Sequence, residues 1–326
     1  FGLSLSTLLP ISTYAKTSQE QRLLPKALQK GDTLGLIAPG YSFSQKVLDE
    51  ALERLKSMGY ESYYTSRINQ SHGYFSNTDE ERAADLNHMF ANPKVDGILC
   101  LRGGYGCTRI LPKINYELIK SNPKALIGFS DITALLSGIY KETGLVGFHG
   151  PVGSTLDNEY SIDSFQRVLQ GDKGYEFIEN VELTTTFPKK EEYERYTITS
   201  GKVKGPLCGG SLTLIIALIG TPHEIDFTGK LVCIEDVEEA PYRIDRMLTQ
   251  LIEGKSFNKA AGIIFGVCAG CNESTNPKSF SLKEVIMDRI KPLGIPSAYG
   301  MSFGHVEHNF TFPIGINAAF DAEKMT

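Results

Sequence analysis

The residues best suited to chemistry lie in the stretch 125–136. An apolar run, Ala-Leu-Ile, leads into Gly128-Phe129-Ser130-Asp131, and a second apolar run of helix-forming residues follows at once. This pattern predicts a strand, a sharp turn and a helix. A serine on such a turn projects from the carboxyl end of the strand, where the amides of the helix N-terminus face a developing negative charge. Ser130 is therefore a candidate nucleophile.

The same four residues also suit a purely structural role. Ser-Asp in front of a helix is a common N-cap, and Gly-x-Ser-Asp differs from the Gly-x-Ser-x-Gly of the lipases. Taken alone, the motif favours a helix cap, so evidence for catalysis has to come from other residues of the chain.

An activated serine needs a base within hydrogen-bond reach and a carboxylate that orients this base. Two of the six histidines end predicted strands, His149 close to the serine in sequence and His305 directly after Gly304. His305 lies in the second half of the chain, where a base would reach across an interdomain cleft. His305 is the preferred base, and His149 stays a rival.

The acidic partner has three candidates. The apolar strand pattern 231–234 ends at Glu235, and Glu238 and Glu239 follow directly. Because all three carboxylates come from the same strand end, the sequence favours Glu235 and leaves the other two open.

A glycine-rich turn, Arg102-Gly-Gly-Tyr-Gly106, follows the predicted strand 95–101. A Gly-Gly pair lets the backbone approach a ligand and leaves an amide free, which could form an oxyanion hole with the amide of Asp131. Glycine also supplies the positive φ that an ordinary tight turn needs. Neither Gly-x-Gly-x-x-Gly nor a Walker lysine motif is present, which argues against a nucleotide-binding loop.

Strand and helix patterns alternate around these residues. Predicted strands at 31–40, 60–68, 95–101, around Ile127 and at 145–148 are separated by helical patterns at 45–58 and 78–90. This order implies a parallel sheet covered on both faces, and ligands bind such sheets at the carboxyl ends of the strands. The candidate serine and the glycine-rich turn share that edge.

Length and charge narrow the class of protein. With 326 residues, the chain is long enough for two domains of about 150 residues each. We predict a tail over 1–28, a nucleophile domain over 29–156, a linker over 157–200 and a second domain over 201–326, which opens with a glycine-rich turn at 201–210. A net charge of −5 argues against nucleic-acid partners, and the sequence contains no transmembrane span.

The six cysteines are scattered through apolar runs and are predicted to be buried free thiols. Cys268 and Cys271 have the spacing of a zinc or redox motif, but no second Cys or His pair lies nearby to complete a metal site. The sequence therefore predicts no metal and no cofactor.

The first residues resemble the apolar half of an export signal. Residues 1–15 contain no charged side chain, and small residues surround Ala15. This pattern favours an exported, periplasmic protein, with a cytoplasmic protein carrying an irregular tail as the alternative.

Several motifs, taken in their order along the chain, strongly resemble the LD-carboxypeptidases. These serine peptidases of bacterial murein recycling are also called muramoyltetrapeptide carboxypeptidases. The motifs are Arg102-Gly-Gly-Tyr-Gly106, Gly128-Phe-Ser-Asp131, Phe148-His-Gly-Pro151, Ile234-Glu-Asp-Val237, Glu239-Ala-Pro-Tyr-Arg-Ile-Asp-Arg246, and Gly304-His305 followed by Pro313-x-Gly315. Their number and length make the resemblance specific.

The resemblance implies a triad of Ser130, Glu235 and His305, with an oxyanion hole at the amides of Gly104 and Asp131. It implies hydrolysis of the amide between meso-diaminopimelate and the terminal D-alanine of a murein tetrapeptide, without a metal or cofactor. The implied fold is α/β, with a flavodoxin-like parallel-sheet N-terminal domain and a smaller C-terminal domain of β-barrel, swivelling character. The implied assembly is a homodimer.

Three further residues are candidates for substrate binding. Gly103 and Tyr105 flank the oxyanion glycine, and the guanidinium of Arg243 suits a substrate carboxylate. An internal ion pair of Arg243 with Asp245 or Asp236 is the alternative.

Three other functions compete with the murein reaction. Microcin-C immunity-type enzymes of the same family cleave peptidyl or aminoacyl nucleotides and often hold the base on a tryptophan, whereas this chain has no tryptophan. A non-catalytic protein could close two lobes on a cell-wall peptide. A glutaminase-like hydrolase is disfavoured, because it would carry a cysteine at the position of Ser130.

Overall fold

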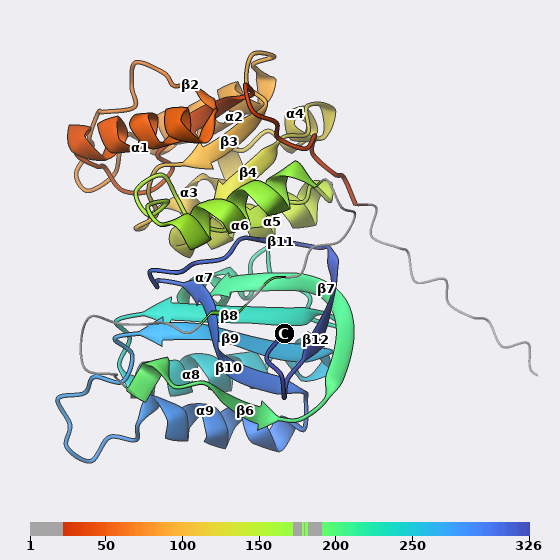
Figure 1. Ribbon diagram of the computed structural model, residues 1–326. Helices are drawn as coiled ribbons and strands as arrows, with labels where there is room; N and C mark the ends of the chain where they lie inside the picture. Colours follow the sequence, from red (N-terminus) through yellow and green to blue (C-terminus); the bar gives the residue numbers. More distant parts are fainter. Residues whose placement is uncertain (1–21, 172–177, 179, 182–190) are drawn as a thin grey trace, which may run out of the picture.

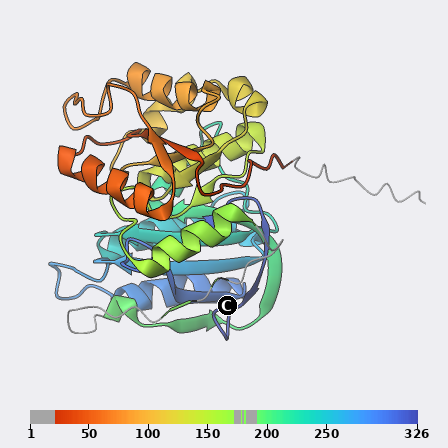
Figure 2. The same ribbon diagram turned by 45° about the horizontal axis from the view of Figure 1, so that its top comes forward.

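The structure, a computed structural model, describes residues 22–171, 178, 180–181 and 191–326. The export-like residues 1–15 lie outside the described residues. Two lobes stand one above the other (Figure 1, Figure 2). Within the described residues, each lobe is built on a six-stranded sheet.

The sheet of the first lobe has the order β11-β5-β4-β3-β1-β2. Strands β1 to β5 are parallel, and β11 pairs with β5 in the antiparallel direction. The strands are β1 (Thr33–Ile37), β2 (Glu61–Tyr63), β3 (Gly97–Cys100), β4 (Ala125–Gly128), β5 (Phe148–His149) and β11 (Phe312–Pro313). The predicted parallel sheet is confirmed, although β2 is shorter than the predicted strand 60–68 because the chain turns away from the sheet edge after Tyr63.

Helices cover both faces of this sheet (Figure 1). Helix α1 ends at Gly59 in the left-handed conformation, and a capping box of Thr78 and Glu81 starts α2, as the sequence predicts. The helices are α1 (Gln45–Met58), α2 (Asp79–Ala91), α3 (Cys107–Ile110), α4 (Tyr116–Ser121), α5 (Thr133–Thr143) and α6 (Glu159–Gln170), with short 3-10 turns η1 (Leu111–Lys113) and η2 (Ser130–Ile132).

The sheet of the second lobe has the order β12-β7-β8-β9-β10-β6 and curves around the core of its lobe (Figure 1). Strands β7 to β10 are parallel, and the two edge strands are antiparallel to their neighbours. The elements are η3 (Glu191–Tyr193), β6 (Tyr196–Thr199), β7 (Lys202–Ser211), α7 (Leu212–Leu218), β8 (Leu231–Val237), α8 (Pro241–Ile252), η4 (Phe257–Lys259), β9 (Gly262–Ala269), α9 (Leu282–Ile290), η5 (Lys291–Leu293), β10 (Ser297–Gly304) and β12 (Asn317–Asp321).

The two lobes share parts of the chain. Strand β11 comes from the second half of the sequence and joins the sheet of the first lobe at β5. The segment 157–200, predicted as a linker, contains α6 on the first lobe and β6 on the second, where β6 pairs with β10. Leu28, in the segment predicted as a tail, is fully buried, and its amide donates a hydrogen bond to the carbonyl of Leu169 in α6.

The glycine-rich segment 201–210, predicted as a turn, is instead most of strand β7. Its glycines allow close packing within the sheet. A Cβ on Gly209 would lie 2.0 Å from the Cys233 carbonyl oxygen, and a Cβ on Gly210 would lie 2.3 Å from Thr133 Oγ1. The adjacent amide of Ser211 donates to the same Thr133 hydroxyl, 3.1 Å away, and so joins β7 to α5 of the other lobe.

All six cysteines are buried and none forms a disulfide. In the part of the chain that the structure describes, no group of three or more His, Cys, Asp or Glu side chains could hold a metal ion. The helices of these same residues are all too short or too polar to cross a membrane.

We expect Gly210→Ala to weaken the contact between the lobes. Gly210 and Gly220 both have positive φ, but a Cβ on Gly220 would meet no atom within 4 Å, so Gly220→Ala is a matched control for backbone strain. Gly210→Ala should lower the free energy of unfolding by about 1–3 kcal/mol more than the control, as overpacking does. Equal losses in urea unfolding would contradict the close approach of Gly210 to Thr133.

Candidate active site

Ser130 lies on a sharp turn between strand β4 and the helical segment η2–α5. Its φ is +61°, a left-handed value that is rare for residues other than glycine. Gly128 permits the turn, since a Cβ there would lie 2.8 Å from Ile132 Cγ1. The N-cap position of η2 is Phe129, and that of α5 is Ile132. Ser130 therefore does not serve as the predicted helix cap, and its strained backbone is typical of a functional site.

The structure brings Ser130, His305 and Glu235 together from three separate elements. The Nε2 atom of His305 lies 3.1 Å from Ser130 Oγ, and its Nδ1 atom lies 2.7 Å from Glu235 Oε2. With its proton on Nδ1, the imidazole donates to Glu235 and accepts from the serine hydroxyl. The arrangement has the order of a nucleophile, a base and an orienting carboxylate.

Electrostatics favour an ionised Glu235. The side chain is fully buried, and burial raises the pKa of its carboxyl group. The neighbouring histidines, His305 foremost, more than offset burial and lower this pKa to about 2. Burial lowers the pKa of His305, but the charge and hydrogen bond of Glu235 outweigh it and raise the pKa above the ordinary value. Each partner thus stabilises the charged form of the other.

The backbone around His305 explains how it reaches Glu235. Gly304 has a φ of +103°, and a Cβ there would lie 2.7 Å from both Cβ and Oε2 of Glu235. Its amide donates to Asn309 Oδ1 at 3.2 Å, which holds the turn after β10. On the other side, the Phe129 ring packs edge-on against the His305 ring, with 4.8 Å between centroids. Only glycine fits at position 304 without moving the Glu235 carboxylate.

The rival candidates lie elsewhere. Glu238 starts the chain's exit from β8, where its amide donates to the Ala269 carbonyl, and Glu239 pairs with Arg243. His149 is fully buried on the far side of the carboxylate, with its Nε2 atom 3.9 Å from Glu235 Oε1. The structure therefore brings Glu235 to His305, and it places His149 beside the acid instead of the serine.

The glycine-rich turn packs directly against Ser130. A Cβ on Gly103 would lie 3.2 Å from Ser130 Cβ and 3.4 Å from the Asp131 amide nitrogen. Gly104 has a φ of +102° and packs against the ring of Tyr41, where a Cβ would approach to 2.4 Å. Because the first turn of a helix leaves its amides unpaired, the Asp131 amide can donate to a ligand at this place.

Two side chains hold this turn in a way that the sequence did not predict. The sequence assigned the Asp131 carboxylate only to the helix start, but it is fully buried and its Oδ2 accepts from the Cys107 amide at 3.0 Å. The buried guanidinium of Arg82 donates to the carbonyls of Gly106, at 3.1 Å, and Pro39. An arginine at a buried position of a helix face was the only sequence signal for this role.

The remaining candidates lie near the surface. Tyr105 is 42% exposed beside the turn. The Arg243 guanidinium donates to Tyr242 Oη at 3.1 Å and pairs with Glu239 at 3.3 Å. The predicted alternative partners of Arg243 were wrong, since the carboxylate that it meets is Glu239. Substrate binding by Gly103, Tyr105 and Arg243 stays a prediction.

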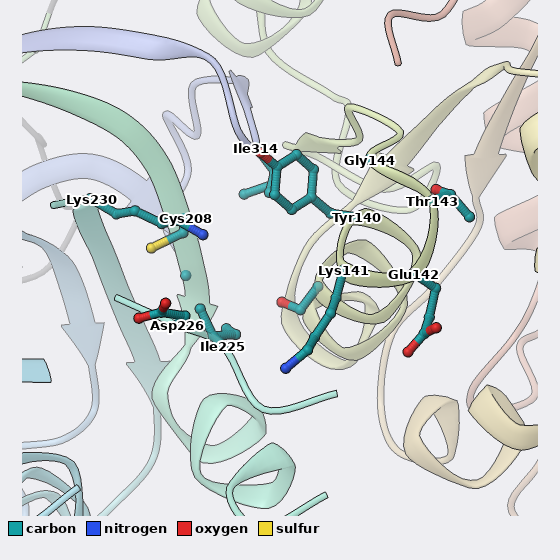
Figure 3. Close-up of a pocket in the computed structure, with 12 residues that line it drawn as sticks. Tyr140, Lys141, Glu142, Thr143, Gly144, Cys208, Ile225, Asp226, Lys230 and Ile314 are labelled. Carbon is teal, nitrogen blue, oxygen red and sulfur yellow. The ribbon is translucent and has the colours of Figure 1, made fainter. Parts of the chain in front are cut away.

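A cavity of about 370 Å³ lies away from this site (Figure 3). It opens between the last turns of α5 and the second lobe, whereas Ser130 precedes the first turn of α5. The residues that Figure 3 labels include Tyr140, Lys141, Asp226 and Lys230. This cavity is therefore distinct from the catalytic candidates.

Comparisons with known proteins identify the family of the chain. The family model of the LD-carboxypeptidase N-terminal domain matches residues 34–150, and that of the C-terminal domain matches residues 204–320. The chain is 40% identical over 308 residues to the "probable murein peptide carboxypeptidase" of Bacillus subtilis, covering 93% of this chain and 92% of that protein.

Two solved structures share the whole architecture. The microcin C7 self-immunity protein MccF, in complex with aspartyl sulfamoyl adenosine, superposes with a TM-score of 0.82 at 26% identity, covering 93% of this chain and 97% of that one. The muramoyltetrapeptide carboxypeptidase from Oxalobacter formigenes superposes with a TM-score of 0.76 at 27% identity, covering 90% and 96%. These matches confirm the predicted two-domain α/β fold.

We expect His305 to titrate above the ordinary histidine pKa of about 6.5, because the Glu235 carboxylate stabilises its imidazolium. Glu235→Gln should lower this pKa. A raised native pKa stabilises the fold below the ordinary value, and that stabilisation is lost as the pH rises through the native pKa. The imidazole proton signal of His305, followed by NMR against pH, measures this pKa in the wild type and in Glu235→Gln. An unchanged pKa in Glu235→Gln would contradict the pairing.

Proposed function

Since this chain belongs to the LD-carboxypeptidase family of serine-type hydrolases, we propose that it hydrolyses the amide between meso-diaminopimelate and the terminal D-alanine of murein tetrapeptides. The observation that carries the proposal is the pair of contacts from Ser130 to His305 and from His305 to Glu235. The name of the Bacillus relative supports murein peptides as the substrate class. The homodimer stays a prediction.

In the first half of the reaction, His305 Nε2 takes the proton of Ser130 as the serine oxygen attacks the substrate carbonyl carbon. Glu235 stabilises the imidazolium that forms. The carbonyl oxygen becomes an oxyanion, which accepts hydrogen bonds from the amides of Gly104 and Asp131. When the tetrahedral intermediate collapses, the carbon–nitrogen bond breaks, and His305 returns the proton to the amine of the leaving D-alanine.

In the second half, water repeats these steps on the acyl-enzyme. His305 takes a proton from the water as its oxygen attacks the ester carbonyl, and the same two amides hold the oxyanion. Collapse then breaks the bond to Ser130 Oγ, and His305 returns the proton to the serine. The products are D-alanine and a tripeptide that ends in a free diaminopimelate carboxylate.

The alternative reaction for this site is hydrolysis of aminoacyl or peptidyl nucleotides. The superposition on MccF supports this alternative. Murein peptides remain preferred, because this chain has no tryptophan to form the aromatic platform that immunity-type enzymes often use for the base. Assays of D-alanine release and of aminoacyl-nucleotide cleavage, run side by side, separate the two substrate classes.

We expect Ser130→Ala to lower the kcat of D-alanine release by about 10⁴-fold or more, because no other hydroxyl replaces the nucleophile. Ser57→Ala, which changes an exposed serine on α1, is the matched control and should keep wild-type activity. The assay follows D-alanine released from a murein tetrapeptide. Activity that survives Ser130→Ala would contradict the nucleophile, and a wild type without activity would favour a peptide-binding protein.

The pH dependence tests the base. Only neutral His305 can accept the serine proton, and its pKa is raised above 6.5 in the free enzyme. We therefore expect kcat/KM to rise with pH and to level off above an inflection that lies higher than about 6.5. An inflection below this value, in a profile measured from pH 5 to 9, would contradict His305 as the base.

A further inference from the structure

The second histidine at the site, His149, has no role in the reaction described above. It is fully buried, and its ring stacks on Phe312 with 4.6 Å between centroids. Its Nε2 atom lies 3.9 Å from Glu235 Oε1, the carboxylate oxygen that His305 does not bind. His149 and His305 thus lie on the two oxygens of one carboxylate.

The polar atoms between these groups are unusual. Both ring nitrogens of His149 and the Oε1 atom of Glu235 are buried without a hydrogen-bond partner in the described residues. Buried polar atoms are nearly always paired, because an unpaired one loses its hydrogen bonds to water without replacement. The 3.9 Å between His149 Nε2 and Glu235 Oε1 is just beyond hydrogen-bond distance, and catalytic hydrogen bonds are often long in free enzymes.

Strand register fixes the place of His149. In β5 it is paired with Gly128 of β4 and with Phe312 of β11. Its partner Gly128 precedes Ser130 by two residues in sequence. Its ring also lies near those of Phe129 and Phe303. This aromatic surrounding packs around the ring and limits its movement.

We propose that His149 is a positioning residue that donates its Nε2–H to Glu235 Oε1 and so holds the carboxylate in line with His305. The proposal rests on the proposed function for its role in turnover. The terminal torsion of a glutamate is broad, so one bond to His305 leaves the carboxylate free to rotate. A second donor on Oε1 removes this freedom, just as hydrogen-bond partners orient the ligands of metal sites.

The contacts of the neighbouring groups favour His149 as the donor to Glu235 Oε1. Asp236, the other carboxylate of β8 at this place, accepts from the amide and hydroxyl of Thr213 at 2.8 and 2.9 Å. His305 already occupies Oε2, and Ser130 is reached by His305 alone among the two histidines. With its proton on Nε2, His149 supplies the missing donor to Oε1.

The test compares two variants. His149→Phe keeps the aromatic packing but has no donor, and His149→Gln places an amide nitrogen close to the position of Nε2. We expect His149→Phe to lower kcat by about 10–100-fold with KM within about twofold, a typical loss when a residue that orients a functional group is removed. His149→Gln should recover most of this loss. The NMR pKa of His305 should fall in the phenylalanine variant and recover with glutamine.

His223→Phe is the matched control, because it changes another histidine that lies beside a carboxylate, 3.5 Å from Glu142 and away from the triad. It should leave kcat and the pKa of His305 unchanged. Thermal unfolding identifies variants that fail to fold. A folded His149→Phe with kcat and a His305 pKa like those of the wild type would overturn the proposal, as would a folded glutamine variant as impaired as phenylalanine.

Two further outcomes separate this proposal from the proposed function. If His149→Phe loses as much activity as His305→Ala, His149 is the base and the positioning role is wrong. If the wild type releases no D-alanine, the proposed function fails, but the pKa of His305 in the two His149 variants still decides whether His149 holds Glu235.

Discussion

The rest of the site depends on one buried charge, the carboxylate of Glu235. A buried carboxylate is stable only when it is paired, and here the pairing group is His305, which directly follows strand β10 of the same lobe. His305 in turn reaches Ser130 in the first lobe. The charge therefore couples the position of His305 in the second lobe to that of Ser130 in the first, and separation of the lobes would break the contact between them.

The contact between the lobes has to be accurate for this reason. Strand β11 of the second half completes the first sheet, and the Ser211 amide binds the Thr133 hydroxyl just after the nucleophile. Both contacts lie within a few residues of a catalytic candidate. The lobes are thus joined close to Ser130, whereas the cavity lies at the opposite end of α5 (Figure 3).

Backbone strain is the second feature of the site. Ser130 has a positive φ, which costs about 1–3 kcal/mol at a residue with a side chain, and the surrounding packing must offset this cost. The Asp131 carboxylate and the Arg82 guanidinium hold the glycine-rich turn against Ser130 through backbone groups. These contacts hold the turn on the side where the oxyanion donors are proposed.

The sequence alone determined the alternation of strands and helices, the elbow at Ser130 and the family, because these follow from local periodicity and from short motifs. It favoured Ser130, Glu235 and His305, yet it left Glu238, Glu239 and His149 open as rivals, since proximity across as many as 175 residues is not a local property. Tertiary structure decided those pairings. It also decided that the glycines of 201–210 form a strand, because Gly209 and Gly210 pack closely against Cys233 and Thr133, which are distant in sequence.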